Sequence, residues 1–281
     1  MSDFGGALKP LNEFPDYRIA VLGVPFDEKS SYLRGAAGGP AAIRRASTGK
    51  CYNEYSELGV NLAEETVLVD LGDVDTSGDV DKTFSLIEKA VAGILAKGAV
   101  PAVLGGDHSI TYPVLKAFGR AGKTIDVLHF DAHPDLYDDL YGDRLSHACP
   151  LTRIMEDGLA RGVVQVGIRA ATPDHKVRAA KFGVRMIEMK DIVDPLFLKF
   201  ANPLYISFDL DALDPAFAPG VSHHEPGGLS TRQAIQIIQA LKSEIVGFDL
   251  VELNAPRDPS GITAAAAFKI VQEIMGKIVR S

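Results

Sequence analysis

The chain has 281 residues, of which 46% are hydrophobic, so it can bury the core of one large α/β domain or of two ordinary ones. Its formal net charge of −8 at pH 7 and its pI near 5.4 argue against nucleic acid and acidic membranes as partners. The only two cysteines, Cys51 and Cys149, cannot form a disulfide framework and suit a reducing compartment.

Neither a leader sequence nor a membrane span is expected. The first stretch, MSDFGGALKPLNEF, has no basic segment and no apolar one, so no secretory signal is visible. Apolar runs such as residues 90–96 are too short to cross a bilayer. These features predict a cytoplasmic protein that binds neither nucleic acid nor membrane.

Short apolar runs alternate with helical segments along the chain. Pro40 begins a stretch that predicts a helix with proline in its first turn, and the apolar residues between Phe84 and Leu95 repeat at helical spacing, with Gly98 as a stop. Residues 262–279 predict a long terminal helix. The expected strands are residues 18–24, 66–72, 99–106, 124–130, 162–168, 203–210 and 245–253.

These strands are apolar on both faces and alternate with helices, which is typical of a parallel sheet covered on both sides. No low-complexity tract, internal repeat or long linker interrupts the pattern. We therefore predict one doubly wound α/β/α domain with a mainly parallel sheet, extending over residues 1–281.

Four of the expected strands run into polar residues, and ligand sites in such folds lie beyond the carboxyl ends of the strands. The four segments are GGDHS (105–109), DAHPD (131–135), DLDALDP (209–215) and DLVELNAP (249–256). In an extended segment residues i, i+2 and i+4 point to one side, so Asp131, His133 and Asp135 converge, as do Asp209 and Asp211.

Charge repulsion indicates what such a cluster binds. Two carboxylates about 4 Å apart repel by roughly 4 kcal/mol at an effective dielectric near 20. Four converging carboxylates would become protonated or would unfold the site, whereas two divalent cations would neutralise them and His108 and His133 would complete their shells. Many carboxylates, few imidazoles and no thiolate favour Mn²⁺ over a structural Zn²⁺.

Other motifs are weaker. Residues 73–84 nearly fit a calcium-binding loop, but Phe84 stands where the bidentate glutamate is needed. Residues 39–50 lack the spacing of a phosphate-binding loop. His129 lies inside an apolar strand and is expected to be a buried supporting residue rather than a ligand, and Cys149 has no evident catalytic partner.

With GGDHS, DAHPD and SFDLDALDPAFAPG in this order, the chain resembles the ureohydrolase family of arginases and agmatinases from about residue 21 to the final helix. GVSHHEPGGLS (220–230) and SHACPLTRIMEDG are most similar to plant-type arginases and to agmatinase-like bacterial members. The resemblance implies one metal ion held by His108, Asp131, Asp135 and Asp209. It implies a second ion held by Asp131, His133, Asp209 and Asp211.

The resemblance also implies the catalytic residues. His147 matches the family's proton-shuttling histidine, and Glu252 matches the carboxylate that holds the guanidinium group. The expected reaction is attack of a hydroxide, oriented by Asp135, on the guanidinium carbon, with protonation of the leaving amine by His147. The products would be urea and a primary amine, the metal would be Mn²⁺ with Ni²⁺ as the alternative, and the protein would be a homo-oligomer, a trimer or a hexamer.

The resemblance implies that the substrate is a small cationic guanidino compound, and the tail of that compound is harder to predict. Where animal-type arginases recognise the amino-acid end of arginine, this chain has Tyr137, Asp143, Thr172 and His175. Asp138, Asp139 and Asp143 would instead suit an ammonium group, so the first expectation is cleavage of agmatine to putrescine and urea, with Asp143, His147 and Glu252 binding the substrate.

Several alternatives stay open. One is arginase activity, which gives ornithine and urea, and others are hydrolysis of guanidinobutyrate or of free guanidine. A non-catalytic metal-binding homologue is a further alternative, although the full set of ligands together with His147 and Glu252 argues against it. His223 and His224 lie in the loop after the third motif and receive no role from the sequence.

Overall fold

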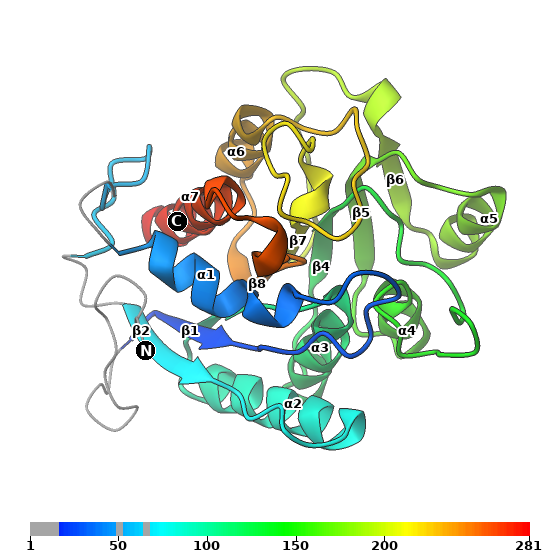
Figure 1. Cartoon of the computed structure of the whole chain (residues 1–281), viewed down its shortest axis with the longest axis horizontal. Helices are drawn as coiled ribbons and strands as arrows, with labels where there is room; N and C mark the ends of the chain where they lie inside the picture. Colours follow the sequence, from blue (N-terminus) through cyan, green and yellow to red (C-terminus); the bar gives the residue numbers. More distant parts are fainter. Residues whose placement is uncertain (1–16, 49–52, 64–67) are drawn as a thin grey trace.

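The computed structural model describes residues 17–48, 53–63 and 68–281. Its centre is a sheet of eight strands in the order β2-β1-β3-β8-β7-β4-β5-β6 (Figure 1). All pairings between these strands are parallel. The strands are β1 (Ile19–Gly23), β2 (Leu68–Asp73), β3 (Val100–Leu104), β4 (Asp126–Phe130), β5 (Gly162–Ile168), β6 (Arg185–Glu188), β7 (Leu204–Asp209) and β8 (Ile245–Val251).

Helices cover both faces of the sheet (Figure 1). One group packs as α1 and α6 against α7, and the other as α2 and α4 against α3. The α-helices are α1 (Gly39–Ala46), α2 (Val80–Ala96), α3 (Thr111–Arg120), α4 (Pro150–Glu156), α5 (Pro173–Phe182), α6 (Thr231–Ala240) and α7 (Ile262–Arg280). The fold is therefore the doubly wound α/β/α arrangement that the alternating pattern predicts.

Each central strand contributes to two separate cores because successive side chains point to opposite faces. In β7, Ile206 and Phe208 pack beneath α1, α6 and α7, whereas Tyr205 packs beneath α2, α3 and α4. All of these side chains are fully buried. Burial on both faces explains why the strands read as nearly continuous apolar runs.

The predicted strand positions agree with the structure to within a few residues, with one strand missed. β6 has only four residues, RMIE, and lies at the edge of the sheet beside β5, so it lacks the apolar run of a central strand. The start of the strand expected at 66–72 lies outside the described residues, as do Cys51 and the N-terminal segment.

The three predicted helices also form. Pro40 lies in the first turn of α1, and Asp79 caps α2 by accepting a hydrogen bond from the Lys82 N–H. α2 ends at Ala96, and Gly98 follows with φ 74°, a conformation that favours glycine. α7 extends one residue past its expected end.

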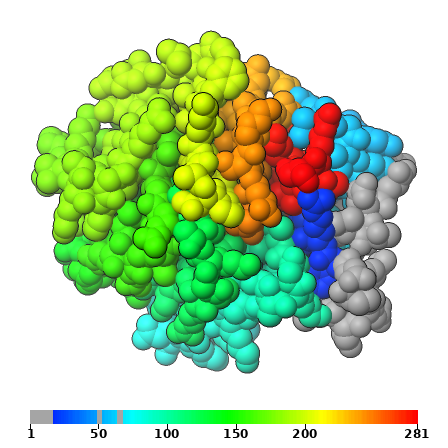
Figure 2. Space-filling model, turned by 180° about the vertical axis from the view of Figure 1, so that it is seen from behind, coloured from blue at the N-terminus to red at the C-terminus, as the bar shows by residue number. Residues whose placement is uncertain are grey.

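The ends of the described chain meet on the far side of the molecule. Figure 2 shows the start of the described chain (blue) beside the end of α7 (red). There Arg18 donates a hydrogen bond to the Val279 carbonyl oxygen at 2.8 Å and another to that of Ile278. Within the described residues, no helix is both long and apolar enough to span a membrane.

Candidate metal centre and active site

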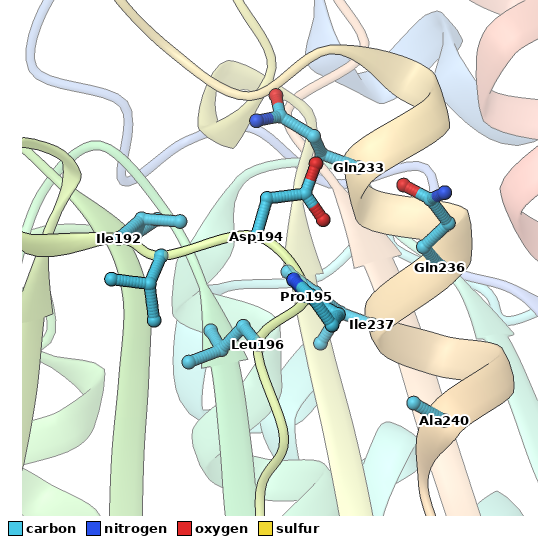
Figure 3. A pocket seen from close by; sticks show the side chains of 9 residues that line it. Ile192, Asp194, Pro195, Leu196, Gln233, Gln236, Ile237 and Ala240 are labelled. Carbon is cyan, nitrogen blue, oxygen red and sulfur yellow. The ribbon is translucent and has the colours of Figure 1, made fainter.

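One cavity, of about 210 Å³, lies beyond the carboxyl ends of the strands. Its lining is Ser31, His133, Asp135, Tyr137, Leu140, Tyr141, His147, Ala148, Ala170, His175, Asp209, Asp211, His223 and Glu252. A groove between the segment after β6 and α6 is far smaller, about 20 Å³ (Figure 3), which is room for roughly one water. A third hollow, beside Arg18 and α7, has no histidine or aspartate in its lining. That hollow is larger, about 570 Å³, and its charged lining residues are Arg18, Lys242, Glu244 and Lys277. Among these cavities of the described residues, the first is therefore the one that gathers histidines and aspartates.

His108 lies among three carboxylates at the base of this cavity. It follows β3 in a short 3₁₀ turn, whose start is capped by Asp107. The Nδ1 atom of His108 is 3.2 Å from Asp131, 3.1 Å from Asp135 and 3.1 Å from Asp209, measured to one Oδ2 atom in each case. These four side chains come from the ends of β3, β4 and β7, as the strand-end pattern predicts.

His133 forms the second half of the cluster. Its Nδ1 atom lies 3.0 Å from Asp211 Oδ2 and 3.4 Å from Asp131 Oδ1. Asp131 therefore faces His108 through Oδ2 and His133 through Oδ1, which is the position of a carboxylate shared by two ions. All six predicted ligands converge, and their exact assignment to two ions stays a prediction.

The donor set fits cations. Ser207 Oγ donates to Asp249 at 2.8 Å and lies 2.9 Å from His108 Nε2, so it accepts the Nε2 hydrogen and leaves a lone pair on Nδ1. This buried Nδ1 has no hydrogen-bond partner among the described residues and faces only carboxylate oxygens. A lone pair directed at carboxylates requires a positive charge between them.

The pKa values of Asp209 and His133 are raised, which also indicates that the cluster is stabilised by positive charge. Burial, together with the negative charges of Asp211 and Asp131, raises the pKa of Asp209 well above its ordinary value. Burial opposes protonation of His133, but the neighbouring Asp211 and Asp131 outweigh it and raise the pKa of the ring. In the absence of a cation, protons are held by these groups instead.

Three residues of the cavity lining adopt backbone conformations that are uncommon outside glycine: Tyr141, with φ 56°, and the functional residues Asp135 and Glu252. Asp135 has φ 51° and Glu252 has φ 65°. Such conformations persist where the surroundings enforce them, and they concentrate at functional sites. They direct the Asp135 carboxylate towards His108 and the Glu252 carboxylate into the cavity.

Glu252 and His147 form a buried pair on the cavity wall. Glu252 Oε1 accepts from the His108 backbone N–H at 3.0 Å and lies 2.9 Å from His147 Nδ1. Burial lowers the pKa of His147, but the hydrogen bond and charge of Glu252, aided by Asp107 and Asp135, raise it to about 9. Glu252 Oε2 is buried without a partner among the described residues, and is thus available to a cation.

The loop after β1 closes over His147. The Ser31 hydroxyl oxygen lies 2.8 Å from His147 Nε2, and the Ser31 N–H points at the same nitrogen at 3.1 Å. The backbone N–H of His147 donates to the Lys29 carbonyl oxygen at 3.2 Å. These contacts hold the ring between Glu252 and the loop.

Asp143 is not brought into the cavity, contrary to the sequence-based expectation. Its Oδ2 pairs with Lys29 Nζ at 2.8 Å, because the loop after β1 folds against the 138–145 segment. Asp138 is similarly engaged by Arg144 and Arg153, each at 2.8 Å, and Asp139 accepts from the Gly142 N–H. None of these three aspartates lines the cavity, so none is placed to hold the tail of a substrate.

Two other strand-end aspartates shape loops. Asp107 accepts hydrogen bonds from the backbone N–H groups of Ser109 and Lys29. Asp214 accepts from the N–H groups of Ala216, Gly227 and Gly228. Neither contacts the histidines of the cluster.

His223 and His224, which received no role from the sequence, lie in different surroundings. His223 lies on the cavity wall, and its ring centroid is within 5.7 Å of those of Tyr32, His133 and His147. His224 turns away and donates to the Pro219 carbonyl oxygen, at 2.7 Å. Only His223 is placed to contact a ligand.

Sequence reasoning missed four residues that support the site: Ser31, Gln165, Ser207 and Glu225. Glu225 lies 3.7 Å from His133 Nε2, on the side of the ring opposite the metal ligands. Gln165 and Ser207, like His129, are single polar residues inside apolar strands, and that interruption was a usable signal. Ser31 and Glu225 lie on loops and carry no such signal.

Both the sequence and the fold of this chain are similar to those of known proteins. The family model described as "Arginase family" matches residues 17–276. The mitochondrial arginase of Medicago truncatula is 43% identical over 92% of this chain and 81% of its own length. The solved structure of arginase from that organism superposes with a TM-score of 0.88, at 43% identity, over 93% of this chain and 87% of that one.

Two further relatives carry other names. The mitochondrial guanidino acid hydrolase of Homo sapiens is 37% identical over 91% of this chain and 77% of its own length. The crystal structure of a hypothetical agmatinase from Burkholderia thailandensis superposes with a TM-score of 0.86 at 30% identity, over the whole of this chain and 91% of that one.

Proposed function

This chain belongs to the arginase family, and we propose that it hydrolyses the guanidino group of L-arginine to give urea and L-ornithine. The observation that carries the reaction is the convergence of His108, His133 and four aspartates beside the Glu252–His147 pair. Four of the six predicted ligands line the cavity together with Glu252 and His147, and the other two, His108 and Asp131, lie against them at its base.

A guanidinium carbon is a poor electrophile because its positive charge is spread over three nitrogens. Two divalent ions, most simply Mn²⁺, would be held by the six ligands and would lower the pKa of water enough to supply hydroxide near neutral pH. Asp135, held in its left-handed conformation at the edge of the cluster, is placed to orient that nucleophile.

Glu252 would hold the substrate through its unpaired Oε2 atom, since a charge-assisted contact from a guanidinium satisfies that buried oxygen. His147 lies on the same wall, with its pKa raised to about 9, so it carries a proton at neutral pH. It would donate the proton on Nδ1, the nitrogen beside Glu252, to the leaving amine as the bond between carbon and nitrogen breaks, because Nε2 faces the Ser31 N–H.

The cavity supports a substrate with a carboxylate better than one with only a second cation. Apart from the predicted metal ligands and Glu252, no carboxylate is among its described lining residues. The other polar groups of the lining that could contact the tail are Ser31, Tyr137, Tyr141, His175 and His223. All of them can donate hydrogen bonds to a carboxylate, whereas none offers a negative charge to an ammonium group.

The similarity to plant arginases at 42–43% identity favours L-arginine over agmatine. The same lining would accept the carboxylate of 4-guanidinobutyrate, which is therefore the second candidate. Agmatine, the first expectation from the sequence, relied on loop aspartates that are paired with Lys29, Arg144 and Arg153.

The test is urea release by manganese- and nickel-loaded protein with L-arginine, agmatine, 4-guanidinobutyrate and guanidine, with the Glu252→Gln variant as the low-activity control. We expect kcat/KM for L-arginine to exceed that for each other compound by at least about tenfold, which corresponds to roughly 1.4 kcal/mol. Urea from none of the four would overturn the enzymatic proposal. A preference for agmatine would overturn the choice of substrate.

A further inference from the structure

Four buried polar side chains form a row across the middle of the sheet, beneath the metal centre. The strand register places His129 of β4 opposite Gln165 of β5 on one side and Ser207 of β7 on the other, and Ser207 opposite Asp249 of β8. Each of the four has no exposed surface. Buried polar groups are costly unless paired, so the row requires an explanation.

One end of the row determines which nitrogen of His129 carries the proton. Gln165 Nε2 donates to the Pro134 carbonyl oxygen at 2.7 Å and lies 3.0 Å from His129 Nδ1. A carbonyl oxygen can only accept, so this Gln165 atom is the amide nitrogen, and its second hydrogen points to Nδ1. His129 Nδ1 is therefore an acceptor, and the ring hydrogen is on Nε2.

At the other end of the row, His108 is also protonated on Nε2. Unlike His129, however, it faces the carboxylate cluster with its unprotonated Nδ1. Ser207 takes the Nε2 hydrogen of His108, which leaves the Nδ1 lone pair facing the carboxylates. The two rings are 4.9 Å apart. One histidine thus presents a lone pair to the cluster, and its neighbour presents an N–H.

Position alone would make His129 a metal ligand. Its Nε2 atom lies 2.9 Å from Asp131 Oδ2, and its ligand atom is close enough to those of His108, Asp131 and Asp135 to share one ion with them. A protonated Nε2 has no lone pair, however, and cannot bind a cation. The tautomer that Gln165 imposes puts an N–H on this nitrogen, 2.9 Å from Asp131 Oδ2, although the two atoms do not form an aligned hydrogen bond in this structure.

The same amide acts on a second ligand. The Pro134 carbonyl that it holds is directly followed by Asp135, whose φ of 51° is uncommon for a residue with a side chain. A hydrogen bond to the preceding carbonyl restrains that turn. Gln165 therefore reaches Asp131 through His129 and Asp135 through Pro134.

We infer that Gln165 and His129 are positioning residues of the metal centre: Gln165 sets the His129 tautomer, so that His129 orients Asp131 instead of competing with it as a ligand. This inference rests on the proposed two-metal function of the site. Partners of metal ligands typically change metal affinity by about 10- to 100-fold when they are replaced.

The first test reads the tautomer directly in the unaltered protein. Nitrogen NMR of ¹⁵N-histidine-labelled protein loaded with diamagnetic Zn²⁺, assigned by comparison with His129→Phe, should show the His129 proton on Nε2. A bare, metal-shifted Nε2 with the proton on Nδ1 would overturn the inference. This readout needs no catalysis, so it is independent of whether any urea is formed.

The second test measures Mn²⁺ affinity by electron paramagnetic resonance of the free ion. Gln165→Met keeps the length of the side chain and removes both donors, so we expect the dissociation constant to rise by about 10- to 100-fold. The matched control is Gln272→Met, since Gln272 is also a buried amide that donates to a backbone carbonyl, that of Asn53, but lies on α7 away from the cavity. Equal Mn²⁺ affinity of Gln165→Met and wild type would overturn the inference.

Discussion

His147 Nδ1 lies 2.9 Å from Glu252 Oε1, and the second oxygen of the same carboxylate, Oε2, is buried without a partner among the described residues. One carboxylate is thus placed to do two things. It holds a proton on His147 through Oε1, and it presents a full or partial negative charge to the cavity through Oε2. A substrate cation bound there would lie beside the group that protonates its leaving amine.

Replacement of Glu252 by glutamine should lower catalytic activity without changing metal binding. The change removes the charge that would hold the guanidinium, so we expect kcat/KM to fall by about 10²- to 10³-fold. Bound manganese per chain, measured by elemental analysis, should be unchanged, because Glu252 is outside the predicted ligand set. Loss of metal in this variant would contradict the role assigned to Glu252.

The pKa of His147 should depend on Glu252. In the metal-free protein, an NMR titration of labelled histidine should give a pKa of about 9 for His147, above the ordinary value of about 6.5. Because the folded-state pKa is raised, the stabilisation from the charged pair is complete below about pH 6.5 and is lost as the pH rises through about 9. In Glu252→Gln the pKa should move down towards 6.5, and an unchanged value would show that another group protonates the ring.

Metal binding should release protons. Burial and neighbouring carboxylates raise the pKa of Asp209 and of Asp211, and three carboxylates raise that of His108, so protons held by these groups must leave when cations bind. The apparent Mn²⁺ affinity should therefore increase from pH 6 to pH 8. Calorimetry in buffers of different ionisation enthalpy should give buffer-dependent heats, and heats that do not depend on the buffer would contradict this protonation.

Much of this site could be predicted because the ligands lie directly after strands. Asp131 and Asp209 each end an apolar run, and parallel strands place their carboxyl ends at one edge of the sheet, so their convergence follows from topology alone. The alternation of Asp131, His133 and Asp135 then needs only the two-residue repeat of extended chain.

The parts that could not be predicted depend on contacts between distant segments. The pairing of Asp143 with Lys29 joins residues 114 positions apart, and it decides that Asp143 is unavailable to a substrate. The proton on His129 depends on the register between β4 and β5, which no single strand encodes. β6 escaped prediction because an edge strand of four residues carries too few apolar side chains.

The buried ion pair between α1 and β2 should be important for stability. Arg44 and Asp70 make two contacts of 2.8 Å, and neither side chain is more than 6% exposed. Asp70→Asn removes the buried charge partner and leaves the guanidinium paired only with the partly exposed Asp73, so we expect the free energy of unfolding to fall by about 1–3 kcal/mol.

The matched control is Glu57→Gln, which breaks an exposed pair with Arg232 and should lower the free energy of unfolding by no more than about 1 kcal/mol. Urea-induced unfolding of both variants at equal protein concentration would measure the difference. Equal effects of the two substitutions would show that burial of the Arg44–Asp70 pair adds nothing.

Asp143→Asn tests whether the loop aspartates select the substrate. Asp143 is paired with Lys29 at 2.8 Å and is absent from the cavity lining, so its charge has no direct path to a bound tail. We expect kcat/KM for L-arginine and for agmatine to change together, by less than about threefold, so that their ratio is preserved. Asp138→Asn, a second loop aspartate outside the cavity, should behave in the same way.

If Asp143 instead binds an ammonium group, the substitution would remove an ion pair from agmatine alone and lower its kcat/KM selectively, by about tenfold or more for each 1.4 kcal/mol lost. Steady-state urea release with both substrates distinguishes the two outcomes, because only the second changes the ratio.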